Sequence, residues 1–266
     1  KQIKLQIMFR NLMLLIMATI GTNQILASTD TVKISYREFG QEHEKKLVII
    51  HGFPGNAEDW IPLAEQLSQD FHVILPDLIG FGENAKKNLS FEELWYDKQA
   101  EAIVETLKDL EIDTISIIAH DYGVPVAVHL DSILSGKVRS MILSAGNTSS
   151  NPPLNPMMKA VPKPIIGGMA KAFLFSKFSI NMMRIMGTKK GKVKPVKNSK
   201  LERQALKTVF ATSLEDMGGY FLPIEKKVSS TQTPIRLIWG EKDPFFPTEH
   251  AQYMMKDMKN ASLSVF

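Results

Sequence analysis

The sequence contains no cysteine, although it is 266 residues long. This absence excludes thiol nucleophiles, cysteine-ligated zinc, iron–sulfur clusters and disulfide-stapled folds, and it leaves the cellular compartment open. The composition is otherwise close to that of an average globular protein, with 44% hydrophobic and 23% charged residues, which excludes a disordered or collagen-like chain. A chain of this length suits one large domain or two small ones.

Acidic residues are almost absent from residues 151–210, where Glu202 stands against 13 lysine and arginine residues. This segment therefore carries a net charge of +12 and the rest of the chain −8, behind a formal total of +4. Such a bias is typical of a solvated insertion, or of a patch that contacts nucleic acid or an anionic membrane. Because no recognition motif accompanies the charge, no nucleic-acid partner is expected. The apolar and basic sequence at 169–178 and 189–194 leaves peripheral membrane contact open.

The apolar run at residues 12–20 is too short for a comfortable membrane span, which needs about 20 apolar residues. Basic residues precede this run and small residues follow it up to Ser28, which is the arrangement of a secretory signal peptide. We therefore expect residues 1–27 to be an export signal and the protein to be secreted or periplasmic. An uncleaved N-terminal anchor is the alternative.

From Ser28 onward, short apolar stretches alternate with longer amphipathic ones. The short stretches have the length and residue types of β-strands, and the longer ones have helical periodicity. Ser90 and Glu93 form a capping box at the start of one helix. The alternation predicts a mostly parallel sheet with helices on both faces. We expect strands at residues 32–39, 46–50, 72–76, 114–119, 138–144, 235–239 and 261–266, and helices at 57–68, 90–107, 124–134 and 248–258.

This alternation stops between residues 147 and 228, where helical sequence rich in proline, methionine and lysine replaces it. We interpret residues 147–228 as a helical lid inserted above the sheet. The lid divides the core into a first part, residues 28–146, and a second part, residues 229–266.

Three loops carry polar residues directly after predicted strands, where α/β sheets place their functional sites. Each loop alone is a weak signal, because an aspartate before a helix is often only an N-cap. Together, in this order and at these positions, they are specific. The loops are His51-Gly52-Phe53-Pro54-Gly55, Ala119-His120-Asp121-Tyr122-Gly123 and Trp239-Gly240-Glu241-Lys242-Asp243-Pro244.

In these motifs, residues 46–266 resemble the α/β-hydrolase superfamily, and within it the epoxide hydrolases and haloalkane dehalogenases. The resemblance implies an α/β-hydrolase fold, with a mostly parallel sheet, flanking helices and an inserted helical lid. It places Asp121 at the nucleophile position of a sharp strand-to-helix turn, which esterases and lipases fill with serine. Gly123 has no side chain, so neighbouring backbone can pack closely against this turn. Ala119 stands where the family usually has glycine.

The resemblance also implies a mechanism. A carboxylate with an ordinary pKa of about 3.9 is ionised at neutral pH, so Asp121 would attack an electrophilic carbon directly and form an alkyl ester. A histidine oriented by Asp243 would then activate water to hydrolyse the ester. The backbone N–H groups of Phe53 and Tyr122 would form the oxyanion hole, and Pro54 would fix that loop through a cis peptide bond. The substrate would be small and apolar, with no cofactor or metal.

The motifs leave two leaving groups to compare, a halide ion and the oxygen of an epoxide. Haloalkane dehalogenases that resemble this chain hold the halide with Trp and Asn at the positions of Tyr122 and Phe53, so both halide donors are missing. The sequence His-Gly-Phe-Pro is typical of epoxide hydrolases, whose lid tyrosines protonate the epoxide oxygen, and Tyr220 is the candidate for that role. We therefore expect an epoxide hydrolase-like enzyme. A haloalkane dehalogenase-like hydrolase and an inactive binding protein on the same scaffold are the alternatives.

Histidine is scarce where this mechanism needs it. The general base of the family follows the acid in chain order, and among six histidines only His250 follows Asp243. His250 falls on the helix after the acid, whereas the base is expected in a loop after the strand at 261–266. We therefore expect the base to lie beyond Phe266, with the domain truncated at its C-terminus. His51 and His120, together with Gly52, are expected to support the site, the histidines through structural hydrogen bonds.

Overall fold

The computed structural model describes residues 32–154, 156–186 and 200–266. Residues 33–266 form one compact unit. The predicted signal peptide at 1–27 and the basic run at 189–194 lie outside the described residues, so export of the protein stays a prediction. Within the described ranges, no helix is long and apolar enough to cross a membrane.

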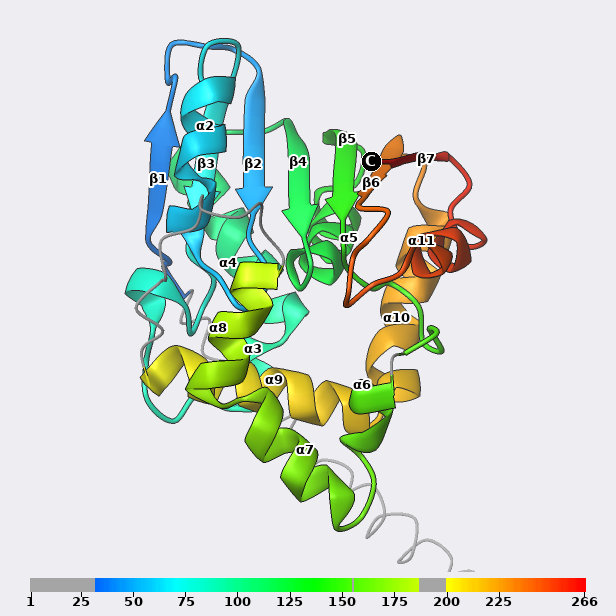
Figure 1. Ribbon diagram of the computed structural model, residues 1–266. Coiled ribbons are helices and arrows are strands. Elements are labelled where there is room, and N and C mark those ends of the chain that lie inside the picture. Colours follow the sequence, from blue (N-terminus) through cyan, green and yellow to red (C-terminus); the bar gives the residue numbers. More distant parts are fainter. Residues whose placement is uncertain (1–31, 155, 187–199) are drawn as a thin grey trace, which may run out of the picture. The chain divides into compact units, whose positions relative to one another are not determined.

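A seven-stranded sheet occupies the centre of the unit, in the order β1-β3-β2-β4-β5-β6-β7 (Figure 1). β1 pairs antiparallel with β3, and the other neighbouring strands pair parallel, which confirms the mostly parallel sheet. The central strands are apolar on both faces because helices cover both. The strands are β1 (Tyr36–Phe39), β2 (Lys46–Ile50), β3 (His72–Pro76), β4 (Ile115–His120), β5 (Val138–Ser144), β6 (Ile235–Trp239) and β7 (Ala261–Val265).

The alternating side chains of β2 show how the helices flank this sheet. Leu47 and Ile49 pack in one apolar cluster with Ala64 of α2, whereas Val48 and Ile50 pack in a second cluster with residues of α4 and α5. The flanking helices are η1 (Ala57–Trp60), α2 (Ile61–Leu67), η2 (Gly82–Asn84), α3 (Phe91–Leu94), α4 (Tyr96–Asp109), α5 (Gly123–Leu134) and α11 (Thr248–Met255).

The helix expected at residues 90–107 is two helices, and the break has a tertiary cause. The capping box at its start is present. The chain then leaves the helix at Trp95, whose backbone is extended with φ −73° and ψ 159°. The carbonyl of Leu94 accepts hydrogen bonds from the Tyr122 hydroxyl at 2.6 Å and from the Gln99 side chain at 3.0 Å. These bonds replace the next helical one, so α4 starts afresh at Tyr96.

Helices α6–α10 follow β5, in the region predicted as a helical lid, and they lie beyond the carboxyl ends of the central strands (Figure 1). Met158, Leu174, Ala211 and Leu214 belong to a small apolar cluster that these helices share. Helix α7 lies farthest from the sheet. The helices are α6 (Pro156–Ala160), α7 (Ile166–Leu174), α8 (Lys177–Met186), α9 (Lys200–Glu215) and α10 (Met217–Ser230).

Candidate active site

Asp121 stands at the sharp turn between β4 and α5, as its motif predicts. Its backbone is left-handed, with φ +50°, a conformation that a non-glycine residue adopts only where the surroundings enforce it. Its N–H donates to the Ser144 carbonyl at 2.9 Å, and its own carbonyl accepts from the Val124 N–H at 3.0 Å. Parallel pairing with β5 on one side and the first turn of α5 on the other therefore fix the position of this carboxylate.

Three glycines allow neighbouring loops to close around the turn. A Cβ on Gly123 would lie 2.6 Å from the Ile50 carbonyl oxygen, and one on Gly52 would lie 2.4 Å from the Asp121 Cβ. A Cβ on Gly146, in the loop after β5, would lie 2.5 Å from the Asp121 carbonyl oxygen. Sequence reasoning selected Gly52 and Gly123 but missed Gly146. Its position directly after a predicted strand was the signal that could have found it.

Two backbone N–H groups hold the Asp121 carboxylate. The Phe53 N–H donates to Oδ1 at 2.7 Å, and the Tyr122 N–H also hydrogen-bonds this carboxylate. The peptide bond between Phe53 and Pro54 is cis, as predicted. The Phe53 ring stacks on the Tyr122 ring with centroids 4.1 Å apart. The structure thus brings the two predicted oxyanion-hole donors together, and the carboxylate of the candidate nucleophile accepts from both.

Burial raises the pKa of Asp121 above that of an ordinary aspartate, because desolvation penalises the charged form. The positive charge that His120 can carry and the two N–H donors act in the opposite direction and lower this pKa, whereas the nearby carboxylate of Asp243 raises it further. The carboxylate is therefore a stronger base than a solvated aspartate, and its solvation is replaced by two fixed N–H dipoles.

The Asp121 carboxylate opens into an apolar pocket between the core and the lid helices. Its polar side chains besides Asp121 are Asn147 and Ser213. The lining residues from the core are Phe53, Trp95, Asp121, Tyr122, Pro125, Asn147 and Phe246, and those from the lid region are Leu154, Met158, Val209, Phe210, Ser213, Leu214, Met217 and Phe221.

Asp243 lies in the loop after β6, where the motif predicts the acid. Its Oδ1 accepts from the N–H groups of Phe245 at 2.8 Å and Phe246 at 2.9 Å, so one oxygen is used to shape the loop. The negative charge of Asp243 raises the pKa of Asp121, so the two carboxylates lie near enough to interact electrostatically. Phe266 continues β7 into this region, because its carbonyl accepts from the Glu241 N–H at 2.8 Å.

The six histidines all lie in the described part of the chain, and none is among the residues that line the pocket. His51 is fully buried; its Nε2 accepts from the Leu78 N–H at 3.0 Å and its Nδ1 donates to the Gly52 carbonyl at 3.1 Å. Burial lowers its pKa, so it is a neutral structural residue, as expected. His120 packs against Trp60 with ring centroids 5.7 Å apart.

His250, the one histidine after the candidate acid, is 1% exposed. It packs against the rings of Trp239 and Phe246 and hydrogen-bonds the Gly146 carbonyl. Burial lowers its pKa to about 4, so at neutral pH it is an uncharged packing residue. The structure therefore agrees with the expectation that His250 is not the base.

The structure does not bring Tyr220 to Asp121. Tyr220 packs against Phe91, with ring centroids 4.6 Å apart, and against Trp95 at 5.5 Å, and it is not among the pocket-lining residues. The helical turn of α10 directs the next residue, Phe221, into the pocket instead. The predicted role of Tyr220 as the acid therefore lacks the geometry it requires in this conformation.

Other side chains of the site were missed by sequence reasoning. Trp95 lines the pocket because of the break before α4, and its side chain hydrogen-bonds Tyr96. Asn147 also lines it, and its side chain forms two hydrogen bonds with the backbone of Ser149, at 2.9 and 3.1 Å. The tryptophan had no recognisable signal, whereas the asparagine follows a predicted strand.

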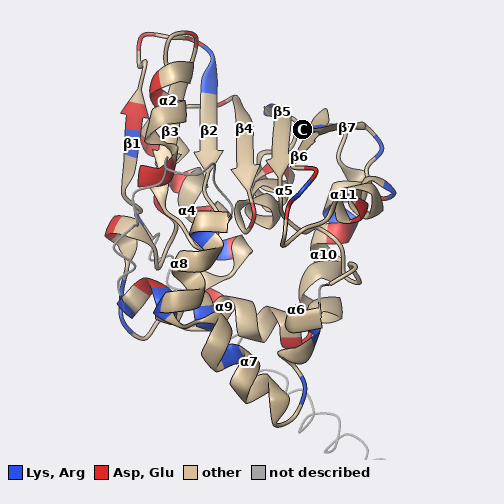
Figure 2. Ribbon diagram, in the orientation of Figure 1, with Lys and Arg blue, Asp and Glu red and all other residues tan. Residues whose placement is uncertain are grey.

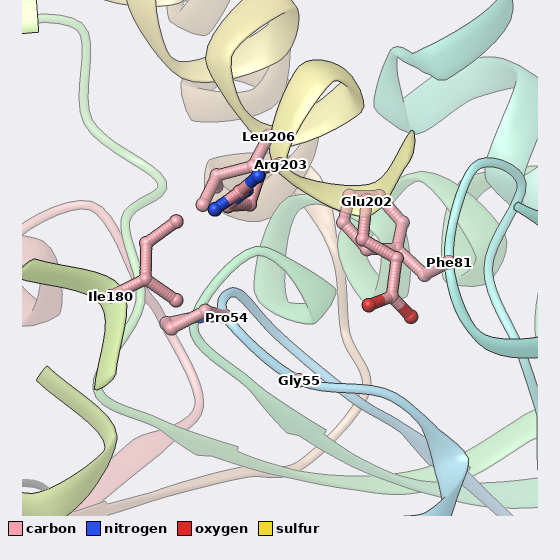
Figure 3. A pocket seen from close by; sticks show the side chains of 7 residues that line it. All are labelled: Pro54, Gly55, Phe81, Ile180, Glu202, Arg203 and Leu206. Atoms are coloured by element: carbon pink, nitrogen blue, oxygen red, sulfur yellow. The ribbon is translucent and has the colours of Figure 1, made fainter. Parts of the chain in front are cut away.

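A buried arginine connects the lid helices to the loop at residues 51–55, which carries Phe53 and Pro54. Arg184 of α8 donates to the Pro54 carbonyl at 2.7 Å and forms an ion pair with Asp59. Glu202 of α9 accepts from the Gly82 N–H at 2.9 Å. Figure 3 shows the small cavity between these contacts, which Pro54, Ile180 of α8 and residues of α9 line.

In the part of the chain that the structure describes, no group of three or more acidic or histidine side chains is placed to hold a metal ion. The site consists of a held carboxylate, two backbone donors and an apolar pocket. This arrangement suits attack by a carboxylate on an uncharged carbon compound.

A sequence model described as alpha/beta hydrolase fold matches residues 45–266. The chain is 32% identical over 119 residues to an uncharacterised hydrolase of Saccharomyces cerevisiae, which covers 44% of the chain and 40% of the yeast protein. It is 32% identical over 83 residues to a soluble epoxide hydrolase of Corynebacterium sp., which covers 31% of the chain and 28% of that protein. The fold is similar to that of the haloalkane dehalogenase DbeA of Bradyrhizobium elkani, with a TM-score of 0.67, 18% identity and coverage of 87% and 84%.

Proposed function

The chain belongs to the alpha/beta hydrolase fold family, and from this premise we propose that it is a hydrolase that uses Asp121 as its nucleophile and forms an alkyl ester. One observation carries the proposal: the Phe53 and Tyr122 N–H groups hold the Asp121 carboxylate at an apolar pocket. A serine hydrolase would keep this pair of donors for the oxygen of its substrate. Here they bind an oxygen of the enzyme itself.

In the first step, Oδ2, the carboxylate oxygen that the Phe53 N–H does not hold, attacks an electrophilic carbon of the substrate. A C–O bond forms between Asp121 and the substrate, and the bond from that carbon to the leaving group breaks. The electron pair stays on the leaving oxygen of an epoxide, which then takes up a proton, or departs with a halide ion. Oδ1 becomes the ester carbonyl oxygen and keeps the Phe53 N–H as its donor.

In the second step, water attacks the carbonyl carbon of the ester and gives up a proton to a base, and negative charge develops on Oδ1. The bond from this carbon to the alkyl-bearing oxygen then breaks, the alcohol leaves with a proton, and the Asp121 carboxylate is restored. The Phe53 N–H already donates to Oδ1 and the Tyr122 N–H hydrogen-bonds the same carboxylate, and each oxyanion-hole donor contributes about 3 kcal/mol to transition-state stabilisation. The step needs a base near Asp243.

Epoxides are the first proposed substrates, because the motif from His51 to Pro54 resembles that of epoxide hydrolases. Haloalkanes are the second candidates, and one observation favours them: no side chain that lines the pocket is a proton donor with acidic character. The Tyr122 hydroxyl is buried and bonded to Leu94, burial raises its pKa well above the ordinary value, and Tyr220 points elsewhere. A halide departs without a proton, whereas an epoxide oxygen requires one.

The two substrate classes form covalent adducts of different mass on the protein. The full chain is incubated with styrene oxide or 1-bromohexane, quenched in acid and weighed by intact-mass spectrometry. An epoxide adds its whole mass, whereas the bromoalkane adds only its alkyl group and releases bromide. We expect an adduct with one class and none in Asp121→Asn. The proposal fails if neither class gives an adduct or product, or if Asp121→Asn is modified at the wild-type rate.

A further inference from the structure

Helix α7 is an apolar helix whose outer side is exposed in the part of the chain that the structure describes. Ile165, just before it, is 90% exposed, and Met169 and Phe173 within it are 73% and 50% exposed. Gly167 and Leu174 are the residues of α7 that are buried. Exposed apolar side chains that are contiguous on one element mark a contact surface, because scattered single ones are the rule on a monomer.

Helix α8 continues this surface after a short connection. Phe178 is 67% exposed and Ile185 is 62% exposed, and Met182 lies between them on the same face of the helix. The opposite face of α8 is buried, with Ile180 in the core and Arg184 bonded to Pro54. The apolar residues on the outer face are thus additional to those that attach the helix to the core.

Positive charge surrounds the apolar surface. From residue 151 to 186 the sequence has five lysine or arginine residues and no acidic one. Lys163 and Lys177 are exposed and lie just before and just after α7. Lys171, the one charged residue within α7, forms an ion pair with Glu215 (Figure 2). An apolar helix flanked by lysines is the pattern of helices that lie in the interface of anionic membranes.

We propose that the outer surface formed by Ile165, Met169, Phe173 and Phe178, with Lys163 and Lys177 beside it, docks on an anionic membrane. The apolar side chains would enter the boundary between headgroups and acyl chains, and the lysines would contact the headgroups. With nine residues, α7 lies in the interface and does not cross the membrane. The positive flanks favour this partner over a second copy of the chain, whose same surface would repel it.

Docking of this kind would place the lid against the lipid. On the buried side of α7, Leu174 packs in one apolar cluster with Met158 of α6 and Leu214 of α9, which line the pocket that holds Asp121. An apolar substrate dissolved in the membrane would then lie one helix layer from the pocket. The membrane proposal is independent of the proposed chemistry, since binding is measured without substrate.

The test is flotation of the full chain with vesicles of phosphatidylcholine alone or with 30% phosphatidylglycerol, at low and at high salt. We expect binding to the anionic vesicles that weakens with salt. The variant Ile165→Ser/Met169→Ser/Phe173→Ser should lose at least about tenfold in partitioning, and Lys163→Gln/Lys177→Gln about 25-fold, since each lysine near an anionic surface contributes about fivefold. These positions are exposed, so circular dichroism should show an unchanged fold.

Matched controls remove apolar and charged groups elsewhere on the surface. Ile133→Ser/Leu222→Ser and Lys256→Gln/Lys259→Gln should bind as the wild type does. Every variant keeps residues 1–31, so any membrane affinity of the run at 12–20 is equal in all of them. Undiminished binding of the triple serine variant would overturn the proposal. It would also be overturned by no binding to either vesicle, or by a wild-type dimer in light scattering that the triple serine variant abolishes.

Discussion

The loops around Asp121 and the outer surface of α7 and α8 differ in which side chains they bury and which they expose. Around Asp121, polar groups are buried and bonded: His51 makes two hydrogen bonds, and the Asp121 carboxylate accepts from two backbone N–H groups. On the outer surface, apolar groups are exposed, as in Ile165 at 90%. The first arrangement fixes one geometry for the proposed chemistry, whereas the second is left exposed by the described residues and is the basis of the proposed membrane contact.

Helix α8 carries both arrangements on opposite faces. Arg184 reaches inward to the Pro54 carbonyl beside the oxyanion loop, and the adjacent Ile185 points outward at 62% exposure. Substitutions on the inner side should therefore lower the stability of the fold or the rate of the reaction. Substitutions on the outer side should change neither.

Gly123→Ala should be the most damaging change. Its Cβ would lie 2.6 Å from the Ile50 carbonyl oxygen and 2.9 Å from that of His51, and backbone atoms cannot move aside easily. We expect a loss of about 3 kcal/mol in the free energy of unfolding, measured in urea. Gly168→Ala in α7 is the control, because nothing lies within 4 Å of its Cβ, and it should leave stability unchanged or slightly higher. Equal effects of the two changes would refute the contrast.

Arg184→Met should have the next largest effect. It leaves the Pro54 carbonyl and the Asp59 carboxylate without their partner in a largely buried place, which should cost about 2 kcal/mol of unfolding free energy. Lys98→Met, which breaks the exposed pair with Glu101, should change stability by less than about 0.5 kcal/mol. A loss no greater than that of Lys98→Met would show that the lid is not attached through Arg184.

Asp121→Asn should stabilise the fold at neutral pH by about 1 kcal/mol, because it removes a buried charge that serves activity and not stability. The pKa of Asp121 is raised in the folded protein, so its charge opposes folding above that pKa and its protonated form favours folding below it. The advantage of the asparagine should therefore shrink as the pH falls and vanish at about pH 4, the ordinary aspartate range. Thermal unfolding of both proteins between pH 4 and 8 measures it, and a variant less stable at pH 7 would contradict this account.

Tyr220→Phe should have the smallest effect. Because the ring packs against Phe91 and Trp95, outside the pocket, loss of its hydroxyl should change the rate of ester formation from an epoxide by less than about twofold. Tyr253→Phe on α11 is the matched control. A loss of a hundredfold or more in Tyr220→Phe alone is the signature of a general acid and would require that this tyrosine turns into the pocket during the reaction.

Much of the core site was predictable because its constraints are local. A strand followed by a turn and a helix places Asp121, and the cis bond before Pro54 and the approach at Gly123 follow from the same motifs. The remaining features depend on contacts between distant segments. Trp95 enters the pocket because Tyr122, far along the chain, binds the Leu94 carbonyl and ends a helix early.

The lid was less predictable for the same reason. Periodicity predicted helical sequence but not which side of each helix faces the pocket, so Tyr220 was selected where Phe221 lines it. The attachment through Arg184 pairs residues that lie 125 and 130 positions apart, and no local pattern marks it.

The most direct test of the central claim is the site of covalent modification. Wild type, Asp121→Asn and Asp243→Asn are each incubated with the substrate class that gives an adduct, then digested and sequenced by tandem mass spectrometry. The ester should lie on Asp121 in the wild type and in Asp243→Asn, since Asp243 acts only in the second step, and Asp121→Asn should react at least about a thousandfold more slowly. An adduct on any other residue, or an Asp121→Asn protein modified as fast as the wild type, would contradict the claim that Asp121 is the nucleophile.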